Sequence, residues 1–147
     1  RMNENIRYFL ECGDDKTALV VAGSVDRVIS HPRIFYAGDL DWETLIGLYK
    51  RCSKFLHLCW GDHAPNGVVH ARICDCQVVC SSVGGTREHA GSDSIVVQEN
   101  EWNFEPVNPN NLPSLDFSKI VSNESYNSEL DLKVCAEKYV KVLEGIL

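Results

Sequence analysis

The chain has 147 residues, of which 44% are hydrophobic and 24% are charged, and its formal net charge is −7. This composition argues against a disordered chain, and the length fits one domain with a sizeable core. No apolar run approaches the roughly 20 residues that a membrane-spanning helix needs. The first ten residues lack the apolar stretch of a secretory signal peptide, so we expect an intracellular protein, cytoplasmic or nuclear.

The negative charge is concentrated in the second part of the chain. Residues 1–87 carry ten basic and ten acidic side chains, whereas residues 88–147 carry four basic and 11 acidic ones. The acidic part would repel a phosphate backbone, and no basic stripe compensates for it in the first part. A nucleic-acid partner is therefore disfavoured, while a protein partner with a basic surface would fit the acidic part.

The N-terminal third predicts short strands. Residues 6–12 and 17–22 are apolar runs separated by the turn-forming sequence Gly13-Asp14-Asp15, which favours two strands joined by a turn. Residues 34–36 form a third apolar run. Pro32 lies just before it and removes a hydrogen-bond donor, which is typical of an edge strand.

The middle of the chain predicts a helix and then strands. A helix begins near Asp39 or Asp41, and its apolar residues recur every three or four positions from Leu45 to Cys59. Residues 55–60 also fit a strand, because a short apolar run cannot be assigned by its period alone. Residues 68–79 are the strongest strand candidate, residues 81–86 form a glycine-containing loop, and residues 94–102 predict a strand with an acidic end.

A second helix is predicted at the C-terminus, after an irregular connector at residues 106–113 that is rich in Pro and Asn. Ser128 and Asp131 resemble a capping box, and an apolar stripe follows them. Such a stripe needs cover, so we expect this helix to dock on the rest of the chain. The stripe consists of Leu132, Cys135, Tyr139, Val142, Leu143 and Ile146. The class predicted is α+β: a single domain over residues 1–147, with a small mixed or antiparallel sheet and two main helices, the second C-terminal.

Clustered cysteines and histidines predict a zinc site. The chain has seven cysteines, and zinc is held by four Cys or His ligands in structural sites. In a strand, alternate residues share a face, so His70, Cys74 and Cys76 would project together. His57 and Cys59 would share a face of the neighbouring strand candidate. The predicted metal ligands are Cys74, Cys76, Cys80, His70 and His89. The alternatives are that these cysteines are small buried apolar residues, or that they are reactive thiols.

Part of this segment resembles a known zinc site. The sequences Ala71-Arg72-Ile73-Cys74-Asp75-Cys76-Gln77 and Cys80-Ser81-Ser82 resemble the zinc-binding segment of the enterovirus chymotrypsin-like cysteine proteases. The resemblance implies metal at Cys74 and Cys76. That family takes its other two ligands from a later Cys-x-His and its nucleophile from Pro-Gly-Asp-Cys-Gly-Gly. Neither motif follows Cys80 here, so the resemblance does not imply protease activity.

The sequence favours a non-enzymatic function. It contains neither GxxxxGK[ST] nor GxGxxG, and no nucleophile elbow. The leading hypothesis is a protein-interaction or regulatory domain that a Cys/His zinc site stabilises. The alternatives are a cysteine-dependent hydrolase, with Cys80 or Cys59 paired to a clustered histidine, and a redox-sensing module built on Cys74 and Cys76.

Overall fold

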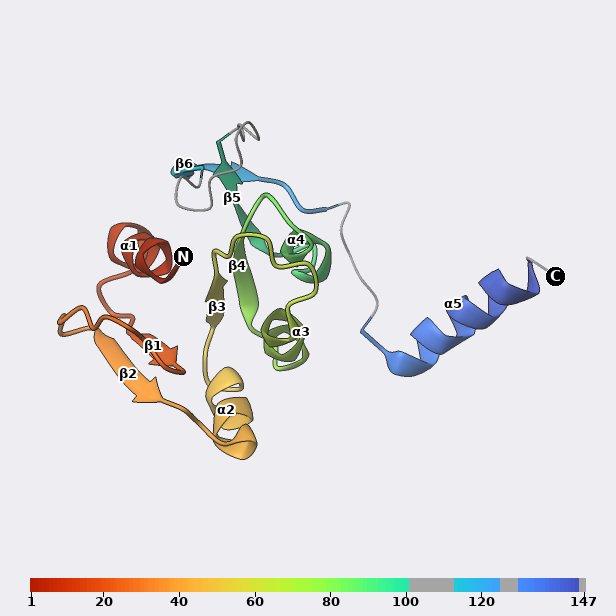
Figure 1. Cartoon of the computed structure of the whole chain (residues 1–147), viewed down its shortest axis with the longest axis horizontal. Coiled ribbons are helices and arrows are strands. Elements are labelled where there is room, and N and C mark those ends of the chain that lie inside the picture. Colours follow the sequence, from red (N-terminus) through yellow and green to blue (C-terminus); the bar gives the residue numbers. More distant parts are fainter. Residues whose placement is uncertain (101–112, 125–129, 146–147) are drawn as a thin grey trace.

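The computed structural model describes residues 1–100, 113–124 and 130–145 (Figure 1). These residues form five helices and two small sheets, of two and four strands. The helices are α1 (Met2–Cys12), α2 (Trp42–Tyr49), α3 (Asn66–Ile73), α4 (Thr86–His89) and α5 (Leu132–Glu144). The strands are β1 (Leu19–Ala22), β2 (Ile34–Gly38), β3 (Lys54–His57), β4 (Gln77–Ser81), β5 (Ile95–Glu99) and β6 (Leu115–Val121). The predicted mixed sheet and C-terminal helix are confirmed.

The larger sheet has the strand order β3-β4-β5-β6, in which β3, β4 and β5 are parallel and β6 is antiparallel to β5. Helices α3 and α4 connect the parallel strands. Strands buried on both faces read as nearly continuous apolar runs, and the Val-Val pairs of β4 and β5 have this pattern. These pairs are fully buried.

Two hydrophobic clusters lie on opposite faces of β4 and β5. On one face, Val78 and Val96 pack with Val68 of α3 and with Ala90, which follows α4. On the other face, neighbouring residues of the same two strands pack with Leu58 and Leu115. Tyr8 of α1 also lies on this second face, with its ring centroid 5.2 Å from that of Phe117. The sheet is therefore enclosed between α3 and α4 on one side and α1 on the other.

The smaller sheet consists of β1 and β2, which are parallel and pair Val20 with Phe35. Its inner face packs on α1, where Ile6 and Phe9 contact Val21 and Ile34. The crossover between the two strands, residues 23–33, contains no helix. Parallel strands are usually connected through a helix, so this crossover is unusual.

One predicted strand is a helix in the structure, and another is part helix and part strand. Residues 6–12 belong to α1, because Ile6 and Phe9 lie three positions apart and bury one helix face against β1 and β2. The predicted strand 68–79 is divided between α3 and β4, with Asp75 at φ 63° in the turn between them.

The strand expected at 17–22 is confirmed as β1, the run at 34–36 lies in β2, and the run at 94–102 contains β5. The helix expected from Asp41 is α2, and residues 54–57 form β3, as the strand alternative predicted.

Helix α5 lies apart from the two sheets (Figure 1). Asp131 caps it, because the carboxylate accepts hydrogen bonds from the amides of Lys133 and Val134 at 2.8 and 3.1 Å. None of its residues is buried, so the prediction that it docks on the rest of the chain is wrong. Ser128, Ile146 and most of the connector at 106–113 lie outside the described residues. None of the helices in the described ranges is both long and apolar enough to cross a membrane.

Candidate functional site at the carboxyl edge of the sheet

The loops that follow β3 and β4 lie in direct contact at one edge of the larger sheet. The amide of Gly85 donates to the carbonyl of Asp62 at 3.0 Å, and the hydroxyl of Ser81 donates to the carbonyl of Cys59 at 2.8 Å. A Cβ at Gly85 would lie 2.0 Å from the carbonyl oxygen of His63. The close packing of the two loops therefore requires glycine at this position.

His57 and Asp62 form the polar centre of this edge. His57 is the last residue of β3, and its Nε2 lies 3.0 Å from Oδ2 of Asp62. The other carboxylate oxygen, Oδ1, accepts from the amide of Ala64 at 3.3 Å, which fixes the turn. The ring of His57 stacks on that of Phe55 at 5.8 Å. Both members of the pair are about a quarter to a third exposed, at 23% and 31%, so they can reach a ligand.

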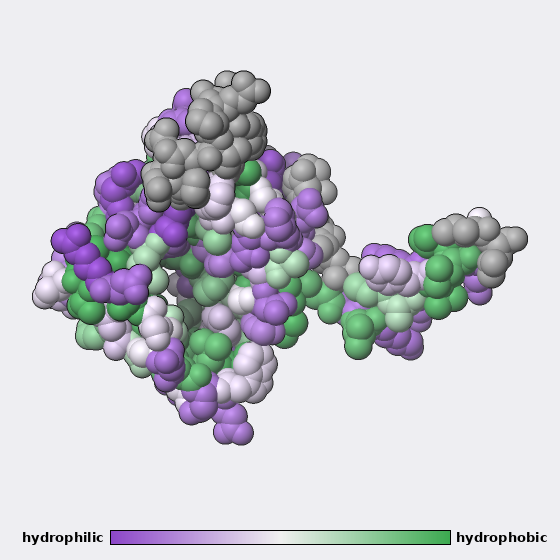
Figure 2. Space-filling model, in the orientation of Figure 1, coloured by the Kyte–Doolittle hydropathy of each residue, from purple (hydrophilic) through white to green (hydrophobic). Residues whose placement is uncertain are grey.

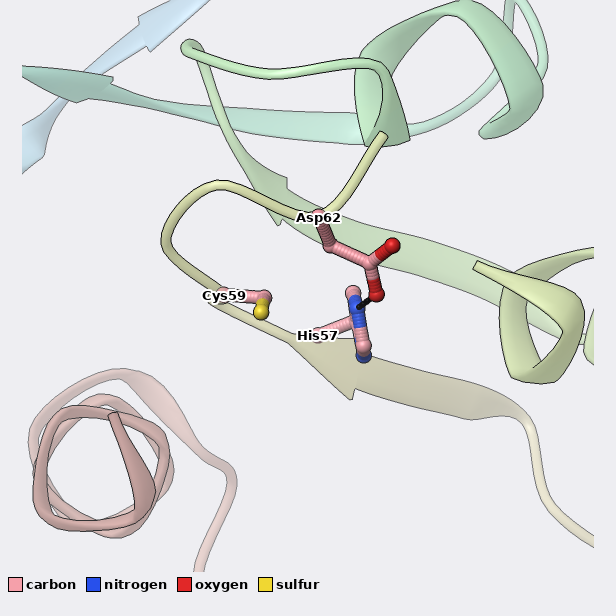
Figure 3. A group of neighbouring side chains, drawn as sticks. All are labelled: His57, Cys59 and Asp62. Atoms are coloured by element: carbon pink, nitrogen blue, oxygen red, sulfur yellow. Dashed lines mark hydrogen bonds and ion pairs between the residues drawn. The ribbon is translucent and has the colours of Figure 1, made fainter. Parts of the chain in front are cut away.

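Cys59 joins this pair as a third group. The ligand atoms of His57, Cys59 and Asp62 all lie within 4.8 Å of one another, and each residue is half-buried. Figure 3 shows the three side chains gathered where the chain turns after β3. An imidazole, a thiolate and a carboxylate are all zinc donors, and three protein ligands leave a fourth position open for water or substrate. The described part of the chain holds no other such group of three.

Two of the predicted zinc ligands are core residues. Cys76 is 4% exposed, and its thiol donates to the carbonyls of Tyr49 and Cys52 at 3.0 and 3.3 Å. Burial raises the pKa of this thiol. Cys80 lies fully buried in β4, and burial raises the pKa of its thiol to about 12. A zinc-bound cysteine is a thiolate, so these surroundings oppose metal binding at both positions.

The other predicted ligands lie on different elements. Cys74 caps the end of α3, His70 lies on α3 with its ring 4.8 Å from that of Trp42, and His89 ends α4. Because residues 70–76 are not one strand, the alternation that would align their side chains is absent. None of the five predicted ligands belongs to the group of three at the end of β3.

Sequence spacing identified His57 and Cys59 as neighbours but missed Asp62. The Gly61-Asp62-His63 turn reverses the chain and returns the carboxylate to the histidine. Comparison with known proteins found no matching family model, no matching curated protein and no matching solved structure.

Proposed function

We propose that this chain is a small-molecule-binding α/β domain whose ligand lies at the carboxyl edge of β3, β4 and β5. The observation that carries the proposal is the contact between the loops after β3 and β4, which gathers polar groups at that edge. Open α/β sheets bind their ligands outside the carboxyl ends of their parallel strands, on loops that the rigid sheet holds in place. Doubly wound folds bind nucleotides there, so nucleotides are the first class to test by this analogy.

The residues at this edge supply groups for polar recognition. His57 and Asp62 provide a partly exposed donor and acceptor pair, and His63 is exposed in the same turn. The main chain at Gly84 adopts φ +92° and passes close to the backbone of Asp62, which brings the second loop against the first. Few but well-placed polar groups of this kind set the orientation of a bound small molecule.

Amide chemical shifts measured by NMR test this proposal. ADP, UDP and NAD are each titrated into the full chain, and we expect shifts confined to residues 57–66 and 81–87. His57→Ala should weaken the binding of the responding nucleotide about tenfold, which corresponds to about 1.4 kcal/mol. His31→Ala, which removes a histidine near the smaller sheet, is the matched control and should leave binding unchanged. Shifts elsewhere, or no response to any of the three, would contradict the proposal.

A second function is favoured by the group of three at the end of β3: we propose that His57, Cys59 and Asp62 bind zinc. Two of the three lie on one turn beside a strand end, so the site needs little rearrangement to form. Zinc would supply a Lewis acid at the open fourth position, next to the proposed ligand edge. Binding requires the Cys59 thiolate and therefore releases a proton.

Zinc titration by calorimetry, with elemental analysis of the purified chain, tests the metal site. One zinc per chain is expected, with binding lost in Cys59→Ser and Asp62→Asn. Cys12→Ser removes an exposed thiol and serves as the control. If Cys74→Ser abolishes binding and Cys59→Ser does not, the metal lies at the site predicted from the sequence and the present assignment is wrong.

The other hypotheses stay predictions. The buried Cys80 pairs with His57 across the sheet, but its raised pKa opposes its use as a hydrolase nucleophile. The sulfur of Cys59 lies within 4.8 Å of a ring nitrogen of His57, so Cys59 is the better candidate. The protein-interaction hypothesis has its best support outside the site, in the apolar surface of α5.

A further inference from the structure

The outer face of the smaller sheet is apolar and uncovered. Alternate residues of β1 and β2 point inward to α1, and the outward positions are exposed. Val20 is 37% exposed and Phe35, its partner in the register, is 56% exposed. The remaining outward residues are Ala22 and Ala37. Parallel strands occur almost only where both faces of their sheet are covered, so this face lacks a layer.

The layer that covers a parallel sheet is usually a helix. In a parallel unit the crossover helix packs on the sheet, but residues 23–33 contain none. Val28, in that crossover, is 62% exposed. The outer face of β1 and β2 is therefore an apolar surface that the crossover leaves without a covering helix.

Helix α5 packs on neither of the two sheets, and none of its residues is buried. Five of its large apolar side chains are exposed, from 51% at Val140 to 83% at Leu132, and Figure 2 shows hydrophobic residues along its length. A helix of 13 residues is marginal in water by itself, so most of its stability must come from packing. The apolar positions span a broad face, which is the pattern of a helix that packs on a sheet or a bundle.

We propose that α5 of one copy of the chain covers the outer face of β1 and β2 in a second copy. Figure 1 places α5 and the smaller sheet on opposite sides of the same molecule, with the larger sheet between them. The helix therefore meets this surface on a neighbouring copy. The contact is head-to-tail, so repeated contacts produce either a closed ring or a growing chain of copies.

The charges of the two surfaces support this pairing. Helix α5 carries three lysines and two glutamates, a net charge of +1 in an acidic chain. Residues 13–41, which are the smaller sheet and its loops between α1 and α2, carry five acidic and three basic side chains. Opposite charge around two apolar surfaces favours their encounter and selects their orientation, and added salt should weaken it.

Light scattering on a size-exclusion column tests the proposal on the full chain. We expect the wild-type chain to elute at multiples of 16.5 kDa that increase with concentration. Phe35→Glu and Leu143→Glu should each give a monomer, because one removes the sheet surface and the other the helix surface. Ile73→Glu replaces an exposed apolar residue of α3 and is the matched control, which should associate like the wild type.

Mixing the two monomeric variants gives the decisive measurement. The Phe35→Glu chain keeps an intact α5 and the Leu143→Glu chain keeps an intact sheet face, so an equimolar mixture should form a 1:1 complex. Pairing of α5 with α5 would instead leave Phe35→Glu associated and the mixture unable to form that complex. Either that outcome or a wild-type chain that stays monomeric at all concentrations would overturn the proposal. Far-UV circular dichroism of each variant checks that both chains remain folded.

Discussion

The larger sheet and α5 contain the same kinds of residue in opposite surroundings. The valines of β4 and β5 and the adjacent Leu58 are fully buried, whereas every apolar residue of α5 is at least partly exposed. Both segments were recognisable as apolar in the sequence. The difference shows that an apolar pattern establishes that a face needs cover, but does not establish which element covers it or whether that element belongs to the same molecule.

The largest expected difference between these regions is in the free energy of unfolding after truncation of a leucine. Leu58 packs fully buried against Val79 and Val97, so Leu58→Ala removes contacts and leaves a cavity. We expect a loss of about 2–5 kcal/mol, measured by urea unfolding with tryptophan fluorescence.

Leu143→Ala provides the matched comparison, because the same truncation is made at a residue that is 61% exposed. Its effect on unfolding of the sheets should be within about 0.5 kcal/mol at a chain concentration where no association occurs. A comparable loss for both variants would show that α5 docks on its own chain in solution.

The elements that the sequence predicts well are those whose local pattern agrees with their final surroundings. The run around Val96 and Val97 is β-branched and central in a sheet, and the C-terminal stripe has helical spacing. The N-cap of that helix is Asp131, which the capping-box pattern had placed inside the helix. Prediction failed where packing overrides propensity. Val68 and Ala71 lie in a β-branched run but bury one helix face in the clusters around the sheet, and Ile6 does the same in α1.

The candidate site was predictable only where it depends on local spacing in the sequence. His57 and Cys59 lie two positions apart, which a strand pattern detects without knowledge of the fold. Asp62 reaches His57 through a reversal of the chain whose shape depends on contact with Gly84 and Gly85, 22 and 23 residues later. A tertiary contact of this kind leaves no periodic signal in the sequence.

The second prediction concerns alkaline pH and the buried thiol of Cys80. Burial raises its pKa to about 12, from an ordinary value of about 9. Above pH 9 the unfolded chain releases this proton while the folded chain retains it, so the free energy of unfolding should fall as the pH rises from 9 to 12. In Cys80→Ala, the free energy of unfolding should fall less between pH 9 and pH 12, by up to a few kcal/mol. Unfolding measured at each pH gives this difference.

Cys135→Ala in α5 is the control for this pH series, since α5 contains no buried residue. Its slope should equal that of the wild-type chain. An unchanged slope for Cys80→Ala would show that the thiol is accessible to solvent in the folded state and that the core around β4 opens locally.

The third prediction concerns Asn123, whose buried side chain anchors the segment that follows β6. This side chain is 2% exposed, donates to the carbonyls of Arg87 and Gly91 and to the hydroxyl of Ser94, and accepts from Nε of Arg87. Asn123→Ala leaves these buried partners unsatisfied and should cost about 1–3 kcal/mol in thermal or urea unfolding. Ser122→Ala changes the exposed neighbour and should have little effect. Equal effects would mean that the segment after β6 is held by its backbone and not by this amide.

The smallest expected effects come from replacing the N-cap aspartate by alanine, once in α2 and once in α5. Asp41 accepts from the amide of Thr44 at 2.8 Å and begins α2, whose Leu45 and Ile46 pack against the core, so Asp41→Ala should lower the melting temperature of the whole body. Asp131→Ala removes the equivalent cap from α5 and should reduce helical circular dichroism and self-association while the melting temperature of the sheets stays the same. Both substitutions delete one carboxylate that caps a helix, and the two helices differ in what they pack on. A lower melting temperature for dilute Asp131→Ala would therefore place α5 on its own chain, whereas a concentration-dependent one would place it on a second copy.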